Sequence, residues 1–441
     1  MIGRKRLSEL TSPQDIPSSA VTGSCTHCPL YTAIRTTHGI KGSMTLVLGA
    51  PECVSYVSDM GRNPDTGACP TVTVMMDWND MTFGAEAKLR EAFSELMEEY
   101  SPEAVFLVTT CIPEITNEDV DTLSDCLSAQ YGIPVAAVHT AHYRQPLREG
   151  TSGALAACAE LMAPSEPNGR VNLLGESERS MDGSELYAVL KEAGVELGVF
   201  LPHCDVRSLS TAAGAALNLV VNPDALALAE RMERRFGTPW FYFAPHPDPD
   251  AVLETYRAFF ERLGKPLPAS LAALHARAGQ SVEAAREAYG GGSFFLGAAG
   301  FPPMELSLFL AELSMEPLLL STDTLPVGSE REAADKLLKR YDPLVVNRLD
   351  RADLDALRAE LRPTAVLGLR ERHGRSSAAV GFEAVEGLLR QLAGRGKRGA
   401  GRERGRGGGE HGRGGSHGHG GRHGENGGRR GGREHGKEGR R

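Results

Sequence analysis

The chain has 441 residues, 41% of them apolar, and this length predicts two or three domains with sizeable cores. No stretch is long and apolar enough to cross a membrane, and the basic N-terminus lacks the apolar run of a signal peptide. Eight cysteines in a chain of this length do not make a disulfide scaffold, so we expect a protein of the reducing cytoplasm.

Charge is divided unevenly along the chain. Residues 394–441 carry a net charge of +9 within a total of −9, which leaves −18 on the preceding body. The acidic body argues against a nucleic-acid-binding core, and we interpret its charge as a source of solubility.

Strand and helix patterns alternate along most of the body. Short apolar segments predict strands at 44–48, 104–110, 133–138, 170–175, 196–201, 240–243, 293–296, 317–320, 344–347 and 365–367. Helical patterns cover 85–100, 122–131, 153–162, 184–193, 224–236, 248–263, 305–313, 330–341, 352–362 and 382–393. This alternation predicts an α/β fold with parallel sheets and crossover helices. We expect three Rossmann-like domains, over residues 1–165, 166–270 and 271–393.

The segment 394–441 has a different composition. Glycine accounts for 21 of its 48 residues, and Ala400 is its single apolar residue, so we expect it to be disordered. Its five histidines include His417 and His419, which could bind nickel, copper or zinc through neutral imidazoles. Nonspecific nucleic-acid binding by its Arg-Gly runs and a purely solubilising role are the alternatives.

Three cysteines, Cys28, Cys53 and Cys111, each lie in a short stretch suited to place the cysteine sulfur at the end of an α/β sheet. The second and third follow apolar segments into a turn, and each of the three has Gly or Pro nearby. Open α/β sheets place their sites outside the carboxyl ends of their strands. Three thiolates from separate loops suit a soft metal or an iron–sulfur cluster better than a disulfide. The alternative interpretation is buried cysteine with no ligand role.

The spacing of these cysteines carries a family resemblance. Cys28 and Cys53 are 25 residues apart, and Cys53 and Cys111 are 58 residues apart. With these intervals and flanks the chain resembles the nitrogenase component 1 superfamily, and within it the β subunit of the molybdenum–iron protein, whose P-cluster cysteines have the same intervals. The likeness is strongest in the first third and continues through Phe83-Gly-Ala85, Val108–Glu114, Val171–Leu174, Gly264–Leu271 and Val380–Phe382.

The resemblance implies a bound cofactor and two kinds of partner. Cys28, Cys53 and Cys111 would hold an iron–sulfur cluster, either 4Fe–4S or P-cluster-like. A second component 1 subunit, or a second copy of this chain, would complete the site at an interface. An ATP-dependent iron protein would supply electrons, since this chain has no P-loop of its own.

The remaining cysteines are less specific. Cys25-Thr-His-Cys28 is a Cys-x-x-Cys pair that by itself could be a zinc half-site or a redox pair. The family interval assigns Cys28 as the ligand and leaves Cys25 as a neighbour or an alternative ligand. Cys69 is a weaker candidate. Helical or strand-end settings predict core positions for the other three, Cys126, Cys158 and Cys204.

The chain departs from the family at two places. Asn222 and Pro223 stand where the cofactor-binding cysteine of the α subunit would fall, which argues against an iron–molybdenum-type cofactor held by that route. After the strand 365–367 the family usually has another strand and a histidine-containing loop, whereas this chain has the short stretch 370–375. Its Arg372, His373 and Arg375 could contact an anionic substrate, and a solvated loop is the alternative.

These observations favour a subunit of a nitrogenase-like reductase, acting on an inert sulfur compound or a tetrapyrrole. Its catalytic residues are not identified by the sequence. A non-catalytic scaffold for metallocluster or metal-cofactor assembly is the alternative, and a structural partner without a cluster is the third. The glycines of 290–300 lack the spacing of a dinucleotide fingerprint and favour a structural turn.

The tail gives the first testable prediction. Cutting the chain after Ala393 should leave the folded body intact and should lower binding of nickel or zinc, measured by titrating both forms. If Arg-Gly contacts with RNA are the function, truncation should instead abolish a salt-sensitive association. Equal metal uptake by the two forms would contradict metal capture by the tail.

Overall fold

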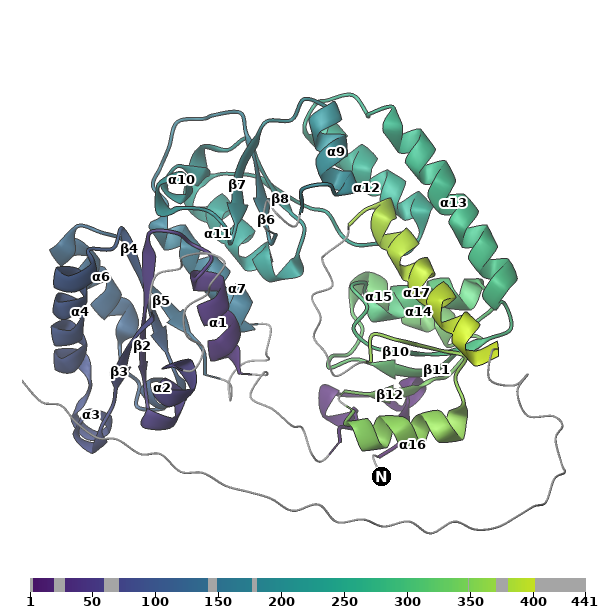
Figure 1. The fold of residues 1–441 in the computed structure, drawn as a ribbon, viewed down its shortest axis with the longest axis horizontal. Coiled ribbons are helices and arrows are strands. Elements are labelled where there is room, and N and C mark those ends of the chain that lie inside the picture. The colour runs from purple at the N-terminus through teal and green to yellow at the C-terminus, as the bar shows by residue number, and fades with distance from the viewer. Residues whose placement is uncertain are drawn as a thin grey trace, which may run out of the picture. The chain divides into compact units, whose positions relative to one another are not determined.

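The computed structural model describes residues 3–19, 28–58, 71–141, 149–176, 181–347, 349–369 and 380–400. Three sheets, almost wholly parallel and flanked by helices, confirm the predicted α/β class (Figure 1). Among these residues no helix has the length and apolar content that crossing a membrane requires.

The first sheet has the strand order β3-β2-β4-β5, and all its pairings are parallel. Its strands are β2 (Ser43–Gly49), β3 (Thr71–Met75), β4 (Ala104–Thr109) and β5 (Val135–His139). Its helices are α1 (Pro29–Thr37), α2 (Pro51–Ser58), α3 (Trp78–Phe83), α4 (Glu86–Tyr100), α5 (Cys111–Ile115), α6 (Val120–Tyr131) and α7 (Glu149–Ala157).

Both faces of this sheet are covered, which explains its continuous apolar strands. On one face Leu46 and Leu107 belong to the same buried cluster as Phe93 of α4. On the other face Phe106 belongs to a cluster with Ile34 of α1 and Leu155 of α7. Every residue of β2 and β4 is buried, so the two strands form a rigid centre from which the following loops project.

The second sheet has the order β7-β6-β8-β9, again fully parallel. Its strands are β6 (Val171–Leu174), β7 (Leu197–Leu201), β8 (Leu217–Val220) and β9 (Trp240–Tyr242). Its helices are α9 (Glu185–Glu192), α10 (Val206–Ser210), α11 (Leu226–Phe236) and α12 (Pro249–Arg262). Asn172 and Asn218 join the central strands β6 and β8 through a buried side-chain hydrogen bond of 2.9 Å.

The third sheet has the order β1-β12-β11-β10-β13. Its strands are β1 (Lys5–Arg6), β10 (Ser293–Leu296), β11 (Glu316–Ser321), β12 (Leu344–Val346) and β13 (Ala365–Leu367). Its helices are α13 (Ser270–Tyr289), α14 (Pro303–Glu312), α15 (Gly328–Leu337), α16 (Arg351–Leu361) and α17 (Phe382–Ala400). Only β1 is antiparallel, and this N-terminal pair of residues adds an edge strand to the third sheet although it falls within the predicted range 1–165.

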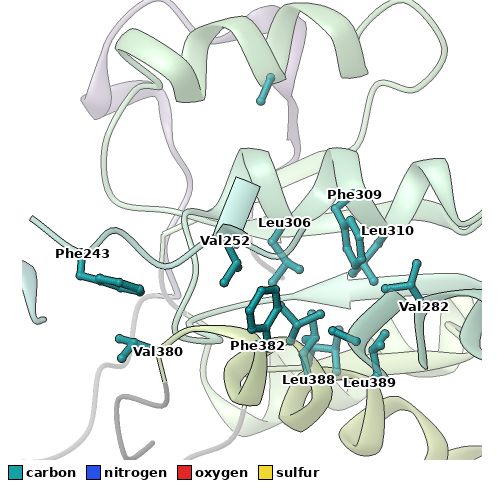
Figure 2. Packing of buried hydrophobic residues seen from close by; sticks show 14 of the residues in the cluster. Phe243, Val252, Val282, Leu306, Phe309, Leu310, Val380, Phe382, Leu388 and Leu389 are labelled. Carbon is teal, nitrogen blue, oxygen red and sulfur yellow. The ribbon is translucent and has the colours of Figure 1, made fainter. Parts of the chain in front are cut away.

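The C-terminal helix α17 is part of the core. Its Phe382, Leu388 and Leu389 belong to the same buried cluster as Leu306 and Leu310 of α14 (Figure 2). Deleting side chains of this size from a packed core costs several kcal/mol, so α17 is an integral element rather than an appendage.

A reciprocal pair of caps fixes the start of α17. The Glu185 carboxylate accepts hydrogen bonds from the backbone N–H groups of Phe382 (2.9 Å) and Glu383 (2.8 Å), and from the Tyr256 hydroxyl (2.9 Å). The Glu383 carboxylate in turn accepts the backbone N–H of Glu185 at 3.1 Å. Each carboxylate thus satisfies first-turn amides of the other residue's helix.

Most predicted elements lie within a few residues of the observed ones, and the differences have local causes. The helix predicted at 153–162 begins at Glu149 and ends in a 3-10 turn, Cys158–Leu161. Nine of the helices and strands among the described residues were not predicted from the sequence, namely β1, α1, α2, β3, α3, α5, α10, β8 and α13. The 20-residue α13 buries only four side chains and so lacks a clear apolar stripe. The boundaries of the three domains stay a prediction.

Candidate functional site

The three predicted cysteines all lie at the starts of helices. Cys28 is the residue that precedes α1, Cys53 is the third residue of α2, and Cys111 is the first residue of α5. Because α2 and α5 follow the neighbouring parallel strands β2 and β4, Cys53 and Cys111 lie at the same edge of the sheet. The partial positive charge at a helix N-terminus favours thiolate over thiol.

The structure brings the three side chains close enough to influence one another. All three are half-buried. Burial raises the pKa of the Cys53 thiol, and the neighbouring Cys111 and Cys28 raise it further because thiolates repel one another. Three thiolates at these positions would therefore repel one another.

A single metal ion does not fit this arrangement. No three His, Cys, Asp or Glu side chains in the part of the chain that the structure describes are placed to hold one ion. A zinc ion binds thiolates at about 2.3 Å, which brings the sulfurs to within roughly 4 Å of one another. Iron–sulfur clusters are also held by cysteine thiolates, and they contain several iron atoms in place of one ion.

Thr110, the residue before Cys111, carries a buried hydroxyl. Thr110 is only 1% exposed, and its hydroxyl has no hydrogen-bond partner among the described residues. The same side chain lowers the pKa of Cys53, against the larger effect of burial. Gly49 lies against it, since a Cβ at position 49 would be 2.5 Å from Thr110 Oγ1.

Glu114 fixes the turn that carries Cys111. This buried carboxylate accepts hydrogen bonds from the Thr109 hydroxyl (2.8 Å) and from the backbone N–H groups of Thr140 (2.8 Å) and Ala141 (3.1 Å). It thereby ties α5 to the end of β5. A buried carboxylate with several donors holds its loop rigidly, because losing it would leave those donors unsatisfied.

The position of Cys28 depends on a close approach between α7 and α1. A Cβ added at Gly150 would lie 2.1 Å from the carbonyl oxygen of Pro29 and 2.3 Å from Thr32 Oγ1. Only glycine allows this contact, which holds the first turn of α1 and the cysteine before it.

The structure describes only some of the remaining predicted residues. Cys25, Cys69, His417 and His419 lie outside the described residues. Cys158 is buried, as expected of a core residue, and burial raises the pKa of Cys204 to about 12. The expectation of a core position for Cys126 is wrong, because this residue is exposed on α6.

Two other candidate sites of the sequence have structural roles. Asn222 uses its side chain to accept the backbone N–H of Asp224 at 3.0 Å, as a helix cap does. At the start of α14, near the predicted glycine turn, the Glu330 carboxylate accepts the N–H groups of Met304 (3.0 Å) and Glu305 (2.9 Å). A phosphate bound at this turn would need these same N–H groups, which already donate to Glu330. This supports the structural interpretation of the turn.

The sequence analysis missed an exposed apolar surface at the edge of the first sheet. We call it the α3 surface, and it consists of Met75, Trp78, Phe83 and Ile115. Trp78 is 84% exposed and Phe83 is 85% exposed. It includes residues of α3 and α5, which follow β3 and β4, at the same edge as α2 (Figure 1). Large exposed apolar side chains in one place indicate a protein-binding surface.

The α3 surface is held rigidly. The Asp77 side chain caps α3 by accepting the N–H groups of Asn79 (2.8 Å) and Asp80 (3.0 Å). Lys88 of α4 donates to Asp80 (2.5 Å) and to the Met75 carbonyl (3.0 Å). A rigid presentation of aromatic side chains reduces the entropy cost of binding a partner.

Comparisons with known proteins give matches in both sequence and structure. Residues 28–382 match the sequence model of the nitrogenase component 1 type oxidoreductases. The nitrogenase iron-molybdenum cofactor biosynthesis protein NifE of Clostridium pasteurianum is 25% identical over 236 residues, 51% of each chain. The NifE of Rippkaea orientalis is 26% identical over 175 residues, 38% of this chain and 37% of its own. The matched part is therefore about half of these relatives or less.

The fold is also that of a solved nitrogenase. The structure of nitrogenase Cp1 at pH 6.5 superposes with a TM-score of 0.69, covering 88% of this chain and 97% of that one at 16% identity. At this identity the likeness concerns the fold alone.

A matched pair of glycine variants tests how Cys28 is held. Gly150→Ala should destabilise the fold by about 1–3 kcal/mol, because the new methyl group meets the Pro29 backbone. Gly153→Ala lies on the same helix with only an ordinary 3.8 Å contact, and should be neutral or stabilising by about 0.5–1 kcal/mol. Denaturant unfolding of both variants measures this, and equal stabilities would contradict the close approach.

Proposed function

The chain belongs to the nitrogenase component 1 type oxidoreductase family, and we propose that it acts as a scaffold on which a metallocluster is assembled or transferred. The observation that carries this proposal is its similarity to the NifE proteins, which are named for iron-molybdenum cofactor biosynthesis. This similarity favours the scaffold over the reductase subunit that the sequence first suggested. The capping role of Asn222, in place of a cofactor cysteine, points the same way.

In this proposal Cys28, Cys53 and Cys111 hold an iron–sulfur cluster. The cluster, when bound, would supply iron atoms that accept electrons and contact further metal and sulfide. The helix N-termini at the three cysteines offset the negative charge of the thiolates. Their half-buried setting limits access of water and oxidants while leaving one side open.

A partner chain would complete the site. Three ligands from one chain leave a cluster with an open position, and four cysteines are the usual set. We infer that a second component 1 subunit, or a second copy of this chain, supplies the missing ligand across an interface. Cys25 is the alternative within the same chain.

The α3 surface is proposed as the place where an ATP-dependent iron protein docks. The surface lies at the sheet edge that carries Cys53 and Cys111, so a protein docked there would have a short electron path to the cluster. Trp and Phe on a rigid helix are typical anchors of a protein interface. The chain has no P-loop, so ATP hydrolysis belongs to the partner.

A reductase subunit remains the second candidate, because a surface for an electron donor beside three retained cysteines also suits an enzyme. A transfer experiment separates the two. The complex is purified anaerobically, loaded with iron and sulfide, and mixed with an apo acceptor protein. A scaffold should lose its cluster to the acceptor, whereas an enzyme should keep its cluster through many turnovers.

Cysteine variants test the cluster assignment. Cys28→Ala, Cys53→Ala and Cys111→Ala should each remove most of the bound iron, measured with labile sulfide after anaerobic purification. Cys204→Ala is the control, since burial keeps this thiol protonated and it should retain the iron. A near-normal iron content in all three variants would contradict the assignment of these cysteines as cluster ligands.

Docking at the α3 surface is tested by removing its aromatic side chains. Trp78→Ala and Phe83→Ala should each weaken binding of a nitrogenase-type iron protein at least tenfold, as loss of a central anchor does. The control is Tyr100→Ala, which removes a 44% exposed ring at the far end of α4. Affinities are measured by biolayer interferometry, and unchanged binding in both variants would place the docking site elsewhere.

A further inference from the structure

We propose that the N-terminal arm, residues 3–19, is a strap that restrains Cys28 from the third sheet. The arm is bound to that sheet, and its end at Ser19 is nine residues before Cys28 in the chain (28 − 19 = 9). Releasing or lengthening the strap should therefore loosen the start of α1 and the cysteine before it. The restraint is a property of the chain itself, and its bearing on a cluster rests on the proposed function.

The first observation is that the arm belongs to the third sheet and to its core. Its strand β1 pairs antiparallel with β12, and just after it the Leu7 N–H donates to the Pro343 carbonyl at 3.0 Å (Figure 1). Leu7 and Ile16 are buried in the same apolar cluster as Leu320 and Val345 of the third sheet. The arm is thus part of the third sheet's fold, although the chain that follows it enters the first.

The second observation is a firm anchor at Ser19, the end of the arm nearest Cys28. Ser19 is 5% exposed, and its hydroxyl donates to Asp353 Oδ2 at 2.8 Å and accepts the backbone N–H of Asp350 at 2.9 Å. Two residues earlier, the Pro17 carbonyl accepts the Asn347 N–H at 2.8 Å. A buried hydroxyl that both donates and accepts is costly to displace, so the arm is held tightly at this end.

The third observation is that only a short tether separates this anchor from Cys28. Nine residues of fully extended chain span roughly 30 Å at most. At its other end the tether meets α1, where the Cys28 carbonyl accepts the Tyr31 N–H at 3.0 Å and Pro29 lies against Gly150. Chain ends that are not tied down are poorly ordered. The tether therefore limits the movement of Cys28, and a longer one would remove that limit.

The far end of the arm is held more weakly. Arg4 pairs with Glu360 at 2.6 Å, but about half of each side chain is exposed (49% and 47%), so the pair contributes little to stability. Ser8 donates to the Asp342 carboxylate at 2.7 Å, also in an exposed setting. A small cavity lined by Arg4 and by Leu357 of α16 remains under this part of the arm. The restraint near Cys28 therefore depends on Ser19.

The test compares two serine variants of the iron-free full chain. Ser19→Ala removes the anchor, and Ser8→Ala removes a matched serine–aspartate bond at the far end of the arm. The rate at which iodoacetamide alkylates Cys28 is measured by mass spectrometry, with the exposed Cys126 as internal reference. Ser19→Ala should raise the Cys28 rate by roughly threefold or more, as loss of a typical hydrogen bond does, and Ser8→Ala should leave it unchanged. Equal Cys28 rates in all three proteins would overturn the proposal.

A second variant lengthens the tether without removing any contact of the described residues. About six Gly and Ser residues inserted after Ser19 form a flexible linker, and such insertions cost little stability. The Cys28 rate should rise as in Ser19→Ala, while the unfolding midpoint stays that of the unchanged protein. The control is the same insertion after the exposed Leu267, between α12 and α13, which should not alter the Cys28 rate. If Ser19→Ala raises the rate and the insertion after Ser19 does not, the effect belongs to the stability of the third sheet, and the strap is overturned.

The strap and the cluster site fail in different ways. Alkylation is measured without iron, so a chain that binds no iron contradicts the proposed function alone. With iron bound, the insertion after Ser19 should speed transfer of the cluster to an apo acceptor, because Cys28 is one of its three proposed ligands. Faster alkylation with an unchanged transfer rate would overturn the part of the strap in holding the cluster, while the cluster site itself would stand.

Discussion

The parallel pairing of β2 with β4 is the constraint on which the candidate site depends. The register runs from Ser43 opposite Ala104 to Leu48 opposite Thr109, and every residue of both strands is buried. A slip of one residue would turn each side chain to the opposite face, so the register is strongly fixed. Because the strands end side by side, the helices that follow begin side by side, and each has a cysteine in its first turn. Without this pairing, Cys53 and Cys111 would not be placed at the same end of the sheet.

The same geometry creates an electrostatic problem. Burial and the neighbouring thiols raise the pKa of Cys53, so the empty site favours neutral thiols. Iron reverses this balance, because a metal cation binds thiolate and releases the proton. The helix N-termini contribute in the same direction but are too weak to offset three thiolates alone. If the proposed cluster binds here, its iron would balance the charge of the three thiolates, and cluster binding should be linked to proton release.

The sequence could predict those features that depend on residues close together in the chain. Apolar strands, the turns after them and the cysteine intervals are all readable from consecutive residues, and they led to α/β architecture and to Cys28, Cys53 and Cys111. Gly150 and Thr110 could not be found this way, because their contacts with Pro29 and Gly49 depend on packing. The sequence offers one signal for Thr110, the pair of threonines before Cys111. The contact of Thr110 with Gly49 becomes visible only in the folded structure.

The surroundings of the cysteines bear on whether the proposed site serves cluster transfer by a scaffold or catalytic turnover by an enzyme. Turnover needs an enclosed site in which the substrate is oriented and water is excluded, whereas transfer needs an exposed edge that a partner can reach. Here the cysteines are only half-buried, and the α3 surface beside them presents two aromatic side chains that are more than four-fifths exposed. Asp77, Asp80 and Lys88 hold that surface rigidly, which lowers the entropy cost of docking rather than of enclosing a small molecule. These features agree with the proposed scaffold, whose cluster must be reached by other proteins.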